Sequence, residues 1–114
     1  MAGYIVRALS LDQNGPTSQF TIAVSVTDDK GLGVQNLSVR NFAVHTITSE
    51  THAAIAELQS AGVPGYYRLL LRTEPQLNSG ECIFALIVTI HRHIAGRVPG
   101  DAETGNTMVK VRVV

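Results

Sequence analysis

Apolar residues alternate with polar ones along most of this sequence, and this period of two constrains the fold more than any other feature. The clearest case is the segment of residues 20–27, where Phe20, Ile22, Val24 and Val26 share one phase. Polar residues occupy most of the other phase. Because successive side chains of a strand point to opposite faces, this segment is expected to be a strand with one buried face.

The same alternation recurs in segments separated by turn residues such as Asn14-Gly15-Pro16 and Val63-Pro64-Gly65. The expected strands cover residues 4–11, 20–27, 38–48, 49–62, 66–72, 81–91 and 107–114. Many short strands with regular turn signals are typical of an immunoglobulin-like sandwich. The sequence therefore predicts an all-β fold, an immunoglobulin-like two-sheet antiparallel sandwich of about seven strands.

Residues 49–62 allow two interpretations. The alanines, Ser49 as an N-cap and the closing Gly62 suit a short helix. The alternation of Ala54, Ala56 and Leu58 and the flanking strands favour a strand. We expect the strand. Residues 73–80 and 95–106 contain Pro and Gly and are expected to be loops.

The length of 114 residues predicts one domain that spans residues 1–114. The formal net charge of zero argues against nucleic acid as a partner, since phosphate binding needs a basic excess. The single cysteine, Cys82, excludes an internal disulfide and is expected to be a small buried side chain. Charged residues make up only 16% of the chain, against about 25% in an average domain, which indicates that part of the surface is covered by something else.

The sequence leaves the cellular location open. The first residues show no signal peptide, and the longest apolar stretch, residues 82–90, is too short to cross a bilayer. We therefore expect no membrane insertion. An extracellular, cell-surface or virion-surface location is favoured if a leader was removed, and a cytoplasmic one if the chain is complete.

Two stretches, VSVTDDKGLGVQNLSVRNFAV and the later GVPGYYRLLL, carry a resemblance to a known family. The matching positions are Val24, Val26, Asp28, Gly31, Val34, Phe42 and Pro64-Gly65-Tyr66-Tyr67. In this respect the chain resembles bacterial immunoglobulin-like repeat domains of the invasin and adhesin type. The resemblance implies a building block of surface, adhesive or assembly proteins without chemistry of its own. Such domains usually occur in tandem, whereas the 114 residues of this sequence are expected to form one domain.

Histidines near the end of residues 81–93 raise the question of a metal. His91 and His93 lie two apart, so on a strand they share a face and can bind one ion. A third ligand is needed, and the candidates are His45, His52, Asp101 and Glu103. Because two ligands specify little, the favoured interpretation is a polar strand end without metal, and no cofactor is expected.

Other residue groups are better explained by structure than by chemistry. Asp28 and Asp29 suit calcium but also form turns. No family signature surrounds the possible nucleophiles Ser10, Ser18 and Cys82, so we expect no enzyme. The remaining features are the glycosylation triplet Asn36-Leu37-Ser38 and the two aromatic residues Tyr66 and Tyr67, of which Tyr67 is expected in the core and Tyr66 over the turn.

The strand at residues 81–91 is apolar on both faces, which is unusual for a sandwich. Cover for the outer face is expected from a partner or from the chain itself. The residues expected at an interface are Ile83, Ala85, Ile87, Leu70, Val109, Val111 and Val113.

These observations predict a non-catalytic structural module. It is expected to self-associate, as a homo-oligomer, or to dock onto a larger complex through sheet edges or the apolar outer face. The alternative is a module that binds a carbohydrate or a metal on a bacterial surface or secreted protein.

Overall fold

The computed structural model describes residues 4–48, 51–78, 80–91 and 102–114. Its regular structure is almost entirely strand. The elements are β1 (Ile5–Ser10), β2 (Thr17–Thr27), the single 3-10 turn η1 (Val39–Asn41), β3 (Phe42–Thr46), β4 (His52–Ser60), β5 (Tyr66–Leu77), β6 (Gly80–His91) and β7 (Ala102–Val113).

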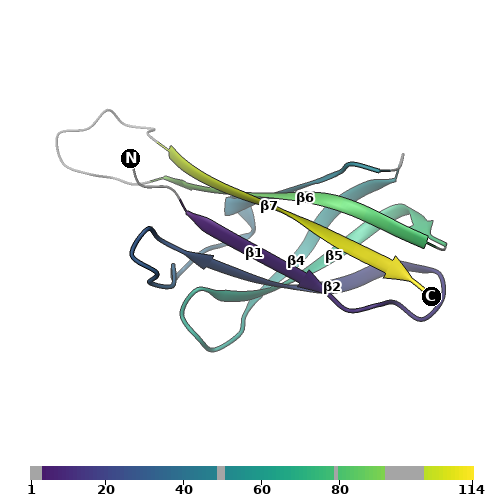
Figure 1. Cartoon of the computed structure of the whole chain (residues 1–114), viewed down its shortest axis with the longest axis horizontal. Coiled ribbons are helices and arrows are strands. Elements are labelled where there is room, and N and C mark those ends of the chain that lie inside the picture. Colours follow the sequence, from purple (N-terminus) through teal and green to yellow (C-terminus); the bar gives the residue numbers. More distant parts are fainter. Residues whose placement is uncertain (1–3, 49–50, 79, 92–101) are drawn as a thin grey trace.

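The strands form two antiparallel sheets that stack face to face (Figure 1). One sheet has the order β1-β2-β5-β4 and the other the order β3-β6-β7. This is the strand order of a seven-stranded immunoglobulin domain of the constant type. The expected immunoglobulin-like two-sheet sandwich is therefore confirmed.

The core lies between the sheets and consists of the inward-facing phase of each strand. Phe20 of β2 and Phe84 of β6 join the two layers, with ring centroids 5.8 Å apart. Phe42 and Tyr67 make a second aromatic contact across the layers, at 6.0 Å. Cys82 is buried in the same core, as expected. Alternation along the strands thus places every second side chain in one shared apolar layer.

Several predicted boundaries were wrong. The segment 38–48 begins with the turn η1, in which Asn41 Oδ1 accepts a hydrogen bond from Ser38 N at 2.9 Å. Residues 73–77, expected in a loop, continue β5 because Thr73 and Leu77 still point into the core. Strand β7 begins at Ala102, so the expected loop at residues 95–106 ends earlier, and its residues 95–101 lie outside the described part of the chain.

The ambiguous segment 49–62 contains the strand β4, so the favoured interpretation is confirmed. Its partner is β5, and the register shifts between Ile55 and Glu57. The strand lies at the edge of the four-stranded sheet. It therefore offers no cover to the outer face of β6, which belongs to the other sheet.

Strands β1 and β7 run side by side and in the same direction along one side of the sandwich (Figure 1). At Gly105 the two strands come so close that an added Cβ would lie 2.6 Å from the carbonyl oxygen of Tyr4. Beyond β1, Gln13 pairs with Val113 in parallel register, and Gln13 N donates to Arg112 O at 2.7 Å. These contacts connect the two sheets along that side.

Candidate interaction surface

The outward phase of β6 carries Ile83, Ala85 and Ile87, as the sequence predicted. Their neighbours Phe84 and Leu86 are fully buried in the core. The three outward side chains are half-buried, since neighbouring strands flank them but no described element lies over them. A central strand with an apolar outer face is therefore present in the folded chain.

Apolar side chains of the flanking strands extend this surface on both sides of β6. Ala43 pairs with Ile87, and Ile47 N donates to Ile83 O at 2.8 Å. On the other side Met108 pairs with Ala85. Ile47 and Met108 are 53% and 66% exposed. We call the resulting surface the apolar band, and it consists of Ala43, Ile47, Ile83, Ala85, Ile87 and Met108.

The two ends of the apolar band differ in charge. Toward one end Lys110 pairs with Ile83 and Arg112 pairs with Glu81, and Lys110 Nζ is 3.7 Å from Glu81 Oε1. At the other end lie Thr89, Thr104 and Asn106, which carry no charge. His45 sits at the β3 side of the middle row, opposite Ala85. The ionisable groups beside the three rows of the band are therefore His45, opposite Ala85, and Lys110, opposite Ile83.

Four of the residues expected at an interface lie elsewhere. Leu70 belongs to β5, on the outer face of the opposite sheet, so it does not extend the surface around Ile83. The side chains of Val109, Val111 and Val113 point inward and are buried in the core. Their shared phase was recognised, but it is the core phase of β7.

The predicted surface did not include Ala43, Ile47 and Met108, which belong to it. Met108 has the phase of Lys110 and Arg112, which marks the outward side of β7. Ala43 and Ile47 have the phase opposite to Phe42 and Val44. The phases were therefore readable, whereas the pairing of β3 and β7 with β6 required the structure.

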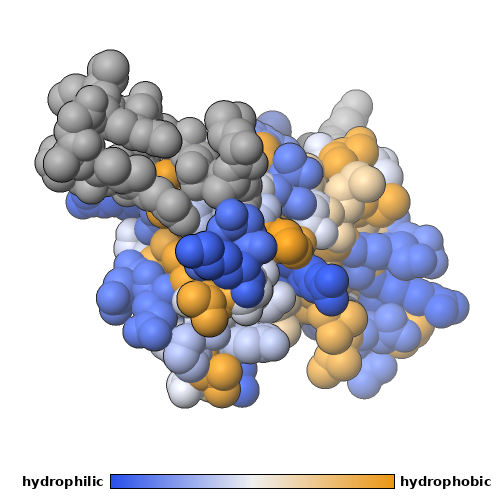
Figure 2. Space-filling model, turned by 60° about the vertical axis from the view of Figure 1, so that its left-hand side comes forward, coloured by the Kyte–Doolittle hydropathy of each residue, from blue (hydrophilic) through white to orange (hydrophobic). Residues whose placement is uncertain are grey.

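The outer face of the β1-β2-β5-β4 sheet has a different composition. Its apolar residues, among them Leu9 and Tyr66, are interrupted by Arg7, Arg68 and Arg72. The small Ala23 and Ser25 of β2 lie between Leu9 on one side and Tyr66 on the other, and they line a shallow hollow of about 200 Å³. On the side of the molecule seen in Figure 2, apolar groups likewise lie separated by hydrophilic ones. Only the opposite sheet brings its apolar residues into one band within the described residues.

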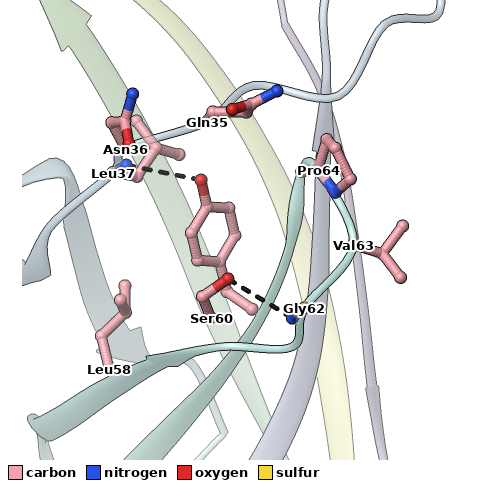
Figure 3. A pocket seen from close by; sticks show the side chains of 10 residues that line it. Gln35, Asn36, Leu37, Leu58, Ser60, Gly62, Val63 and Pro64 are labelled. Atoms are coloured by element: carbon pink, nitrogen blue, oxygen red, sulfur yellow. Dashed lines mark hydrogen bonds between the residues drawn. The ribbon is translucent and has the colours of Figure 1, made fainter.

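A hollow of about 400 Å³ lies where the turn at residues 61–65 faces the segment 35–37 (Figure 3). Tyr67 forms its inner wall and is 4% exposed, so Tyr67 is a core residue, as predicted. Its hydroxyl donates to Val34 O and accepts from Leu37 N at 3.4 Å. Tyr67 thus holds the crossing segment, residues 34–37, which lies between β2 of one sheet and β3 of the other. Among the described aromatic residues only Tyr66, at 51% exposure, presents its ring to solvent.

The histidine prediction falls mostly outside the described residues. His93 and Asp101 are not described, nor are the side chains of His91 and Glu103. His45 lies on β3 and His52 on β4, in different sheets. Among the described residues no three metal-binding side chains come together. The His91 and His93 pair remains a prediction from sequence.

Asp28 forms a turn with its carboxylate. Its Oδ1 accepts hydrogen bonds from the backbone N of Lys30 at 2.9 Å and of Leu32 at 3.0 Å. The neighbouring Asp29 is exposed. This arrangement is an Asx turn, in which a carboxylate oxygen accepts hydrogen bonds from backbone N–H groups.

The structure shows the surroundings of the possible nucleophiles Ser10, Ser18 and Cys82. Ser10 Oγ donates to Leu11 O at 3.1 Å, and Cys82 is buried. Ser18 and His52 line the same hollow of about 470 Å³, but no hydrogen bond joins them within the described residues. The exposed Asn36 of the glycosylation triplet adopts a positive φ of 63°.

Comparisons with known proteins found no matching family model and no matching curated protein. One solved structure is similar over the full length: AggA, the major subunit of aggregative adherence fimbriae type I from Escherichia coli. The likeness covers 100% of this chain and 96% of that chain, at 9% sequence identity and a TM-score of 0.41. In the part of the chain that the structure describes, no helix is long and apolar enough to cross a membrane.

Proposed function

We propose that this chain is a non-catalytic assembly module of the immunoglobulin-like class, which docks onto protein through the outer face of the β3-β6-β7 sheet. The observation that supports the proposal is the apolar band, centred on the outward side chains Ile83, Ala85 and Ile87 of β6. An outer sheet face in water normally carries polar residues in this phase. Exposed apolar patches of this kind mark sites of protein association.

The size of the face sets the expected strength of docking. From Glu81 to Thr89 the face extends about 27 Å along β6 and about 14 Å across three strands, which gives roughly 400 Å². At about 25 cal/mol per Å² of apolar area, burial of the apolar part of this face contributes less than roughly 10 kcal/mol, and association costs about 4–15 kcal/mol. The two terms are of similar size, so docking through this face alone is reversible.

The wider role follows from the resemblance of the stretches VSVTDDKGLGVQNLSVRNFAV and GVPGYYRLLL to bacterial surface repeat domains. Such a domain serves as a building block, and a docking face connects it to its neighbours. A surface or secreted location in a bacterium agrees with this role. The proposal includes no cofactor and no catalytic step.

Photo-crosslinking of the full protein in the cells that make it tests the docking face. A photo-reactive amino acid replaces Met108 in the apolar band or, as the control, Arg68 on the opposite sheet, and adducts are detected by a size shift. We expect several-fold more adduct from position 108 than from position 68. Equal yields at the two positions, or no adduct at position 108, would overturn the proposal.

A further inference from the structure

The apolar band is nearly symmetric about its middle row. That row contains His45, Ala85 and Met108, and the rows of Ile83 and Ile87 lie two residues away on either side. Ile47 flanks the first of these rows, and Ala43 flanks the second. A two-fold axis along the middle row therefore places the Ile83 row of one copy on the Ile87 row of another.

The charges fit the same arrangement. The two-fold axis places the end with Glu81, Lys110 and Arg112 over the uncharged end of the other copy, with Thr89, Thr104 and Asn106. Lysine and arginine then meet hydroxyl and amide groups instead of like charges. The chain as a whole has no net charge, so two copies do not repel each other at long range.

The side chains along the axis allow close approach. Ala85 is small and lies on the central strand, and the flexible Met108 stands beside it with 66% of its surface exposed. Met108 side chains from two copies can fold over the two alanines, because methionine adapts to irregular gaps. The same axis places the exposed His45 of one copy beside His45 of the other, at the margin of the row.

We infer that the occupant of the apolar band is a second copy of this chain, packed face to face about a two-fold axis along the row of Ala85 and Met108. This inference rests on the proposed docking face and adds the identity of the partner. The face buries roughly 800 Å² in total between two copies, about half of a standard interface. The dimer is therefore expected to be weak and to form between micromolar and millimolar concentrations.

Analytical ultracentrifugation of the purified chain over this concentration range tests the inference. The wild-type mass should rise toward twice the monomer mass. Ile83→Lys should raise the dissociation constant at least tenfold, because it places a charge against the second copy. Leu70→Lys is the matched control, since Leu70 is also half-buried and on the outer face of a central strand, but in the other sheet. It should change the constant less than twofold.

A second variant distinguishes weaker dimerisation from misfolding. Met108→Lys changes a largely exposed position and should keep the wild-type unfolding midpoint while it weakens the dimer as Ile83→Lys does. Met108→Cys, treated with a short bis-maleimide, should give a covalent dimer, whereas Arg68→Cys should not. Cys82 is buried and leaves the background low.

A chain that stays monomeric up to millimolar concentration overturns the inference. An equal rise in the dissociation constant for Ile83→Lys and Leu70→Lys overturns it as well. If that monomer still gives adducts from position 108 in cells, the docking face stands and its partner is a different protein. If both results are negative, the docking face fails as well.

Discussion

The two outer faces of this sandwich are built on the same plan but distribute their apolar residues differently. On the β3-β6-β7 sheet the residues of the apolar band adjoin one another across three strands, with His45 opposite Ala85 and Lys110 opposite Ile83 at its margins. On the β1-β2-β5-β4 sheet, Arg7, Arg68 and Arg72 separate the apolar side chains. Arginine keeps its charged end in water and covers apolar neighbours with its stem.

This difference teaches that exposed apolar area alone does not identify a docking face. Ile5 and Leu9 of the arginine-containing face are 51% and 67% exposed, comparable to residues of the apolar band. What distinguishes the band is that its members pair directly across strands, so their exposed surfaces merge. A partner that covers the apolar band dehydrates one charged side chain, Lys110, whereas the arginine-containing face presents Arg7, Arg68 and Arg72.

The comparison assumes that inward positions stabilise the fold and outward positions of β3-β6-β7 do not. Phe84→Ala should lower the free energy of unfolding by about 3–5 kcal/mol, because it leaves a cavity against Phe20 in the centre of the core. Ala43→Ser, on the outer face, should change it by less than about 0.5 kcal/mol. Urea unfolding measures both, and similar losses for the two variants would break the comparison.

Inward and outward positions of the other sheet can be compared by removing a single hydroxyl oxygen from each. Tyr67→Phe removes the hydroxyl that connects Val34 O and Leu37 N and should cost about 1–2 kcal/mol. Tyr66→Phe changes an exposed neighbour and should cost less than about 0.5 kcal/mol. Thermal unfolding of the two variants at equal concentration compares them. If Tyr67→Phe leaves the free energy of unfolding unchanged, the hydrogen bonds of the Tyr67 hydroxyl do not stabilise the crossing segment.

The smallest effect is expected at the charged end of the apolar band. Glu81→Gln removes the pair with Lys110, whose side chains are 51% and 58% exposed, respectively. Exposed pairs contribute little, so the free energy of unfolding should change by less than about 0.5 kcal/mol. Urea titrations at low and high salt measure this change. A loss above 1 kcal/mol would mean that the charged end stabilises the fold and is not only a rim of the proposed docking face.

The period-two pattern predicted the architecture because alternation determines the inward phase of each strand. Phe20, Ile22 and Leu86 are buried where the pattern placed them. The pattern was less informative where composition and position disagree. Thr73 and Leu77 continue β5 through a polar, proline-containing stretch, and Val39 lies in a 3-10 turn despite its β-branched side chain.

The candidate surface was only partly predictable. Phase within a strand identified Ile83, Ala85 and Ile87, but phase carries no information about which sheet a strand joins. Leu70 was assigned to the wrong surface for that reason. Val109 and its neighbours show the related problem that phase alone does not say which of two faces is the inner one. Pairing partners answer both questions, and they depend on contacts far apart in sequence.

The parallel contact between the first and last strands also has a mechanical consequence. Gln13 N and Gly15 N donate to Arg112 O and Val114 O, and Val114 N donates to Gln13 O, all within a short distance along the edge. A force that pulls the two strands in opposite directions along their length loads these hydrogen bonds in shear, so all of them resist it at the same time. Strands that peel apart would break their bonds one by one. The edge that connects the sheets is thus expected to resist extension of the domain along its strands.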